Sequence, residues 1–153
     1  SAHCVIPVNE AYESLNVTSE SESQVAADDP ADLSTRKFQR ELSAGLTALV
    51  LLSVLADAAD DLYGYEIARR LGGEQEGSGP FKLGALYPVL RNLSAAGLLS
   101  SRVVPSYAGP PRRYYRITPL GRDALAAWRA TWSTTRDFVD AVLNRAAAQE
   151  TSP

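Results

Sequence analysis

The chain has 153 residues, 45% of them apolar, with a single Cys and a single His. This length allows one globular domain with a core and at most a small second unit, and one Cys excludes an internal disulfide framework. The longest apolar run, residues 46–56, is shorter than the roughly 20 residues of a membrane-spanning helix, and residues 1–15 lack the pattern of a secretory signal. We therefore expect a cytoplasmic protein with no membrane partner.

The formal net charge of −3 conceals a segregation of charge along the chain. Residues 1–33 carry seven carboxylates and no Lys or Arg, whereas residues 34–153 hold 15 basic against 11 acidic side chains. Within the second part, residues 77–122 contain seven basic side chains and no Asp or Glu. Such a block favours contact with a polyanion, the alternative being an ordinary solvated surface.

The composition predicts four segments. Residues 1–33 are acidic and Ser-rich, which is typical of a flexible arm, because such a segment buries too little apolar surface to offset its ordering entropy. A domain over residues 34–118, a long helix over residues 119–147 and a tail over residues 148–153 follow.

Two helices are expected at the start of the domain. The first begins at Ser34 as N-cap and ends near Ala59, and the second, of about ten residues, is capped by Asp60 or Asp61 and closed by a Gly pair. On the first helix, the helical period places these apolar residues on one face: Phe38, Leu42, Leu46, Leu49 and Val50.

A third amphipathic helix is expected within residues 81–97, after a Gly-Ser-Gly-Pro break. Its buried stripe is Leu86, Leu90 and Leu93, and Gly97 is its C-terminal stop. The opposite face presents Lys82, Ala85, Tyr87, Arg91 and Asn92.

Two short strands, residues 98–104 and 112–118, are predicted next, joined by a turn rich in Gly and Pro. The period of two places Tyr115 and Ile117 on the core face of the second strand and Arg112, Tyr114 and Arg116 on the other. Three helices followed by a hairpin indicate a mainly α fold with a small β-hairpin, the winged helix-turn-helix plan.

In this plan the third helix enters the major groove of double-stranded DNA and the hairpin contacts the backbone beside it. Base selection then falls to Ala85, Tyr87, Pro88, Arg91 and Asn92, since Arg recognises guanine and Asn recognises adenine. The alternative role of Tyr87 is ordinary packing. The alternative for Arg91 and Asn92 is that they lie on a solvated helix face with no binding role. Phosphate contacts are assigned to Arg112, Arg113 and Arg116, and a hydrogen bond or packing on sugar to Tyr114.

The last helix starts with Pro119 and runs for about seven turns. Its a/d seam has no further element of the chain to cover it, so we expect a homodimer that presents two recognition helices to a palindromic operator. The seam consists of Leu125, Trp128, Trp132, Thr135, Val139 and Val142.

The motifs YGYEI, LYPVLRNL and GPPRRYYRITPLGR, taken in this order, resemble the PadR family of bacterial transcriptional regulators across about residues 41–145. The resemblance implies a winged-helix repressor with a dimerising C-terminal helix, released by a small aromatic effector. It implies DNA contacts for Tyr87, Arg91, Arg112, Arg113 and Tyr114, and places Trp132 where some members stack flat ligands.

Two features depart from the family pattern. Lys82 and Ala85 stand where the family usually has a Ser-like cap and a Thr, so a hydroxyl contact is lost and Lys82 supplies a phosphate contact in its place. The acidic arm is not part of the family core, and we expect it to compete with DNA for the basic face. Trp128 and Trp132 either line an effector site or only pack in the seam.

No enzymatic activity, metal or cofactor is expected. The only His and the only Cys are His3 and Cys4, both in the predicted arm, where no packed shell orients them for catalysis. The alternative function is that of a winged-helix dimer that binds a protein partner and has no specific DNA target.

Overall fold

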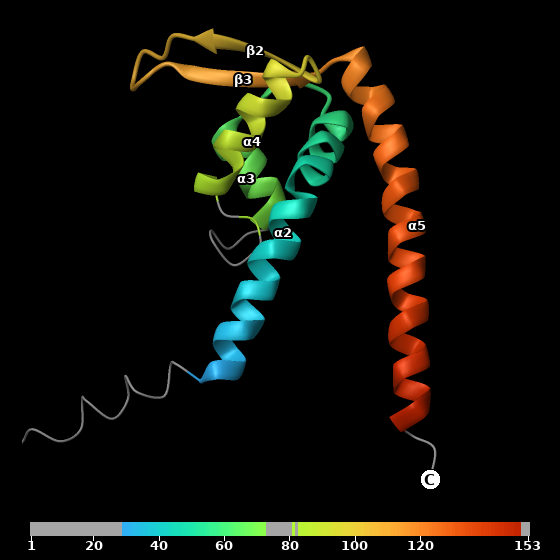
Figure 1. The fold of residues 1–153 in the computed structure, drawn as a ribbon. Helices are drawn as coiled ribbons and strands as arrows, with labels where there is room; N and C mark the ends of the chain where they lie inside the picture. Colours follow the sequence, from blue (N-terminus) through green and yellow to red (C-terminus); the bar gives the residue numbers. More distant parts are fainter. Residues whose placement is uncertain (1–28, 73–80, 82, 151–153) are drawn as a thin grey trace, which may run out of the picture. The chain divides into compact units, whose positions relative to one another are not determined.

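The computed structural model describes residues 29–72, 81 and 83–150. It is mainly helical with a small antiparallel sheet, which confirms the predicted fold class (Figure 1). Most of the predicted acidic arm lies outside the described residues. The described elements are α2 (Pro30–Asp57), β1 (Leu62–Tyr63), α3 (Gly64–Gly72), α4 (Leu83–Ala95), β2 (Leu99–Val104), β3 (Arg112–Ile117) and α5 (Pro119–Glu150).

The chain divides into two units between Phe38 and Gln39, within α2. In the first unit, α2 begins at Pro30 and not at the predicted cap Ser34. Asp29 is the cap, because its Oδ1 accepts a hydrogen bond from the backbone N–H of Ala31 at 3.1 Å. Pro30 in the first helical position needs no hydrogen-bond acceptor, so the helix starts earlier than its apolar period suggests.

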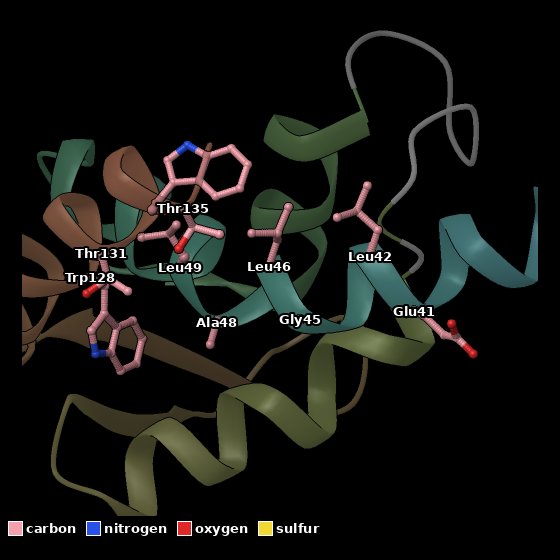
Figure 2. A pocket seen from close by; sticks show the side chains of 10 residues that line it. Glu41, Leu42, Gly45, Leu46, Ala48, Leu49, Trp128, Thr131 and Thr135 are labelled. Atoms are coloured by element: carbon pink, nitrogen blue, oxygen red, sulfur yellow. The ribbon is translucent and has the colours of Figure 1, made fainter. Parts of the chain in front are cut away.

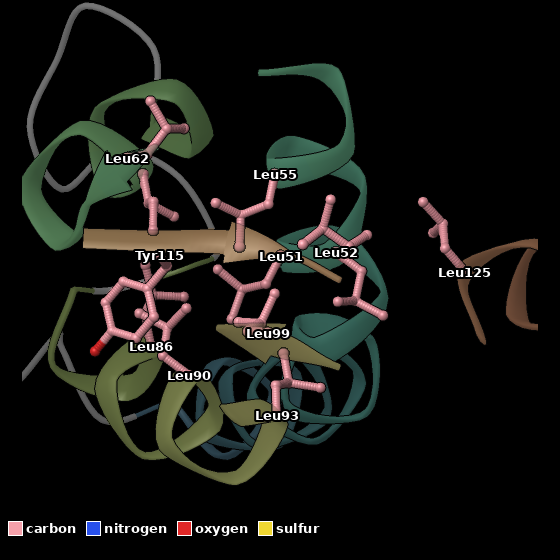
Figure 3. Packing of buried hydrophobic residues seen from close by; sticks show 12 residues of the cluster. Leu51, Leu52, Leu55, Leu62, Leu86, Leu90, Leu93, Leu99, Tyr115 and Leu125 are labelled. Atoms are coloured by element: carbon pink, nitrogen blue, oxygen red, sulfur yellow. The ribbon is translucent and has the colours of Figure 1, made fainter. Parts of the chain in front are cut away.

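The second unit contains the hydrophobic core (Figure 3). Leu51, Leu52 and Leu55 of α2 face residues of α3, α4 and the sheet in one cluster. Of the apolar face predicted for this helix, Phe38 is 64% and Leu42 48% exposed, whereas Leu49 packs against the core cluster. The other residues of the cluster are Leu62, Ile67, Leu86, Leu90, Leu93, Leu99, Tyr115, Ile117 and Leu125.

Among the described residues, α2 is the one helix long and apolar enough, by length and composition, to cross a membrane. The core helix of a globular domain passes the same test, and the second half of α2 packs in the core. We therefore assign the second half of α2 to the domain core.

The sheet has three strands in the order β1-β3-β2, all antiparallel, one more strand than the predicted hairpin. The additional strand, β1, pairs Leu62 with Tyr115 and Tyr63 with Tyr114. The predicted cap of the second helix is also wrong, because Glu66 accepts a hydrogen bond from the Tyr63 N–H at 3.1 Å in the manner of a capping box.

The core-facing residues predicted for the third helix and for the second strand of the wing are confirmed. Leu86, Leu90 and Leu93 are buried, and Gly97 ends the helix with a φ of 76°, a conformation that favours Gly. On β3, Tyr115 and Ile117 are buried, while Arg116 between them is exposed.

Thr118 ties the base of the wing to α5. Its hydroxyl accepts a hydrogen bond from the Gly121 N–H at 3.0 Å and donates to the carbonyl of Gly97 at 2.7 Å. Gly121 packs so tightly that a Cβ there would lie 2.1 Å from the carbonyl oxygen of Leu98. The end of α4, the sheet and the start of α5 therefore meet at one closely packed point.

The seam predicted for α5 divides into two parts. Leu125 is 4% exposed and belongs to the core of its own chain, and Trp128 packs against that core. The expectation that nothing in the chain covers the seam is therefore wrong for its first part. Farther along the helix, which ends at Glu150, Val139 and Val142 are exposed, as predicted, together with Phe138 and Leu143.

Candidate nucleic-acid interface

The outward side of α4 carries the predicted recognition residues. Ala85, Tyr87, Pro88, Arg91 and Asn92 are all exposed, because the leucine stripe on the same helix faces the core. The side chain of Lys82 lies outside the described residues. One helix therefore presents an Arg, an Asn and a Tyr together on a solvent-facing surface.

Tyr87 combines packing and exposure. Its ring lies against the backbone of Gly64 at the start of α3, where a Cβ on residue 64 would fall 2.7 Å from Cε1 of the ring and 2.8 Å from the hydroxyl. The residue is nonetheless 40% exposed. Gly64 thus permits an approach that fixes the Tyr87 ring while leaving one side of it open to solvent.

Arg113 joins this side of the molecule from the wing. It has the same parity on β3 as the buried Tyr115, and its guanidinium donates to the hydroxyl of Ser101 at 3.1 Å. Burial raises the pKa of the Tyr115 hydroxyl, and the nearby charges of Arg113 and Arg91 oppose that rise. We call the surface formed by Ala85, Tyr87, Pro88, Arg91, Asn92 and Arg113 the α4 face.

The opposite side of the sheet carries a second group of basic and aromatic side chains. The Tyr63 ring lies 5.5 Å from the Tyr114 ring, centroid to centroid, with Arg112 over Tyr63 at 4.7 Å and Arg102 over Tyr114 at 5.3 Å. The register places these residues on the side of the sheet that does not face the core. We call Tyr63, Arg102, Arg112, Tyr114 and Arg116 the outer face.

Asp61 occupies the edge of the outer face. Its Oδ2 accepts from Nε of Arg102 at 2.8 Å, and its Oδ1 accepts from Nε of Arg116. Hydrogen bonds from these two guanidinium groups hold the pKa of the Asp61 carboxyl below its usual value. The carboxylate is therefore ionised at neutral pH and paired with both arginines.

The structure separates the predicted phosphate-contact residues into two sets. Arg113 belongs to the α4 face, whereas Arg112, Tyr114 and Arg116 lie on the outer face. Sequence reasoning missed the roles of Asp61, Tyr63 and Arg102 there, since Asp61 pairs with residues 41 and 55 positions away and no local pattern indicates such partners.

A largely apolar cavity of about 520 Å³ lies between α2 and α5. Figure 2 shows Leu42, Leu46 and Leu49 in succession along α2, with Trp128 on α5. Leu42, Leu46 and Leu49, three residues of the apolar face predicted for the first helix, thus line this cavity. The remaining lining residues are Glu41, Gly45, Ala48, Thr131, Trp132 and Thr135.

Within the part of the chain that the structure describes, no cluster of His, Cys, Asp and Glu can hold a metal ion. The basic, aromatic and amide groups of the two faces are instead suited to hydrogen bonding and to pairing with anions.

Comparison with known proteins agrees with the resemblance of the sequence motifs. The profile of the Transcriptional regulator PadR-like family matches residues 51–127, half of the chain. The chain is 42% identical over 93 residues to the transcriptional regulator Rv3488 of Mycobacterium tuberculosis. The aligned region covers 59% of this chain and 75% of that protein.

Solved structures of the same family share the fold. A PadR family transcriptional regulator from Eggerthella lenta is 26% identical with a TM-score of 0.56, covering 82% of this chain and 97% of that chain. A PadR-like regulator from Bacillus cereus is 25% identical with a TM-score of 0.55, covering 67% and 96% respectively. The protein therefore belongs to the PadR-like family of transcriptional regulators, which is not a class of enzymes.

Proposed function

We propose that this regulator is a cytoplasmic homodimer that binds a specific double-stranded DNA operator through its α4 face. The observation that carries the proposal is the exposure of Tyr87, Arg91 and Asn92 on one helix surface, together with Arg113 on the side of β3 that carries the buried Tyr115. An exposed helix of this kind fits the major groove, where Arg and Asn distinguish bases, while a neighbouring cation contacts phosphate.

DNA binding is tested by fluorescence anisotropy with DNA from upstream of the protein's own gene and with a scrambled duplex, from about 50 to 200 mM salt. We expect tighter binding to the upstream fragment and a steep loss of affinity with salt. Equally weak binding to both duplexes would contradict the proposal for this fragment and favour a winged-helix module that binds protein.

Arg91→Ala tests the recognition helix directly. We expect it to reduce the preference for the upstream fragment by about 1–3 kcal/mol, since a bidentate contact to a base is lost. Arg145→Ala removes the same charge from an exposed position near the end of α5 and serves as the matched control. Equal effects of the two substitutions would show that Arg91 contributes charge alone.

Dimerisation is supported by the exposed apolar residues of the distal part of α5. Phe138 is 66% and Leu143 61% exposed, with Val139 and Val142 between them, and a second copy of α5 would cover this surface. We expect Val139→Asp to produce monomers in sedimentation velocity and Asn144→Asp, which introduces the same charge on the opposite side of α5, to leave the dimer intact. Monomeric wild-type protein would overturn this part of the proposal.

We further propose that the protein represses transcription and that a small aromatic effector in the α2–α5 cavity releases it from DNA. The support is the size of the cavity, about 520 Å³, and its lining of Leu and Trp side chains. Flat aromatic compounds should quench Trp fluorescence and weaken DNA binding, and Trp132→Leu should abolish both effects. If no compound of a broad panel quenches, the tryptophans have a packing role only.

A further inference from the structure

We propose that Asp61 is a specificity-determining positioning residue: it keeps Arg102 and Arg116 paired on the outer face and so withholds two cations from the DNA phosphates. This inference rests on the proposed DNA-binding function, because it concerns which arginines contribute to that binding. Its basis is that arginines of the outer face are paired with a carboxylate, whereas those of the α4 face have no carboxylate partner among the described residues.

In these ion pairs the carboxylate is much less exposed to solvent than the two guanidinium groups. The side chain of Asp61 is only 12% exposed, whereas those of Arg102 and Arg116 are 63% and 62% exposed. Each carboxylate oxygen accepts from one arginine, so a single Asp serves a strand residue of β2 and a strand residue of β3 at once. Both guanidinium groups are thereby held near the base of the wing.

Stability alone gives a weak reason for this arrangement. Ion pairs whose cations stand mostly in solvent contribute little to folding. The sheet already has two antiparallel ladders and a buried side formed by Leu99, Tyr115 and Ile117. The stronger consequence of Asp61 is the local neutralisation of positive charge.

Every arginine of the outer face has an interaction within the chain. Arg102 and Arg116 pair with Asp61, and Arg112 stacks over the Tyr63 ring at 4.7 Å. On the α4 face, by contrast, the partner of Arg113 among the described residues is the neutral hydroxyl of Ser101. Arg91 has no carboxylate partner within residues 29–72, 81 and 83–150.

This contrast bears on specificity. Phosphate contacts raise affinity for every DNA sequence alike, whereas base contacts raise it for one sequence. A cation that is already paired must give up its carboxylate before it neutralises a phosphate. Asp61 therefore limits sequence-independent attraction and leaves the α4 face, with its base-recognising side chains, as the dominant contact.

The test is the salt dependence of binding to a scrambled duplex. In Asp61→Asn, Arg102 and Arg116 lose their counter-charge, so we expect the slope of log affinity against log salt to steepen by about 0.9 for each additional phosphate that the protein neutralises. Each such phosphate changes affinity about 3.5-fold between 50 and 200 mM salt. Affinity for the upstream fragment should rise less, so the specificity ratio should fall.

Three controls separate charge from structure. Asp60→Asn makes the same charge change at the neighbouring exposed residue and should leave the slope nearly unchanged. Asp61→Glu keeps the charge and should retain the wild-type slope. The triple variant Asp61→Asn, Arg102→Gln, Arg116→Gln removes the released cations and should return the slope to the wild-type value or below it.

An unchanged slope in a folded Asp61→Asn protein would overturn the inference, and so would a loss of affinity for both duplexes with a lower melting temperature, which indicates a structural role only. Failure of the proposed function has a different signature. In that case the wild-type protein itself shows no preference for any operator fragment, while its slope on the scrambled duplex can still be compared with that of Asp61→Asn.

Discussion

The two sides of the three-stranded sheet are built from alternate residues of the same strands, yet they serve different purposes. The inner side buries Tyr115 and Ile117 against the helices, and its contacts hold the fold together. The outer side carries Tyr114 and three arginines whose charges are stacked or paired. One strand thus packs into the core on one side and carries paired or stacked arginines on the other.

The largest expected effect comes from breaking the inner side. Tyr115→Ala removes an aromatic side chain that is 4% exposed, and we expect a loss of about 3–5 kcal/mol in the free energy of unfolding. Tyr114→Ala, its neighbour on the outer side, should cost less than about 1 kcal/mol. Chemical denaturation of both variants checks this, and similar losses would show that the two sides contribute equally to stability.

A substitution at Gly121 tests how closely the inner side of the sheet packs against the start of α5. A Cβ at this position would lie 2.8 Å from Cγ1 of Ile117 as well as against the Leu98 carbonyl. We expect Gly121→Ala to destabilise the protein by about 1–3 kcal/mol, because backbone must move. Gly45→Ala is the control, since a Cβ there meets nothing within 4 Å, and thermal melting of the pair distinguishes close packing from a general effect of Gly in helices.

Two adjacent arginines on β3, Arg112 on the outer face and Arg113 on the α4 face, allow the contributions of the two faces to DNA binding to be compared. We expect Arg113→Ala to reduce the salt slope of DNA binding by about 0.9, because Arg113 lies beside the α4 residues, and Arg112→Ala to reduce it less. Anisotropy titrations on one duplex at several salt concentrations measure both slopes. A larger reduction in Arg112→Ala would place the DNA on the outer face instead.

The smallest expected effect concerns pH. Because the pKa of the Asp61 carboxyl is lowered in the folded state, its pairs stabilise the fold above the unfolded-state pKa of about 3.9, and this contribution is lost as pH falls through the lower folded-state pKa. The stability difference between wild type and Asp61→Asn should be constant near neutral pH and shrink in acid. Denaturation curves between about pH 3 and 7 test this, and a difference that grows in acid would contradict the assigned sign.

The local pattern of the sequence predicted the parts that depend on neighbouring residues. The leucine stripe of α4, the Gly97 stop and the alternation of β3 follow from helix and strand periods, so the outward direction of Tyr87, Arg91 and Asn92 was predictable. The motifs also predicted the family, since they lie at the start of α3, in α4 and in the wing.

Only the tertiary structure decided which of several apolar or charged surfaces meets which partner. Both α2 and α5 carry more apolar residues than one contact requires, so the period alone did not show that Leu51 enters the core while Leu46 lines a cavity. Nor did it show that Leu125 is covered by its own chain. Asp61 was an equally good helix cap by sequence, and it became the partner of two wing arginines because strand pairing brought distant residues to its side.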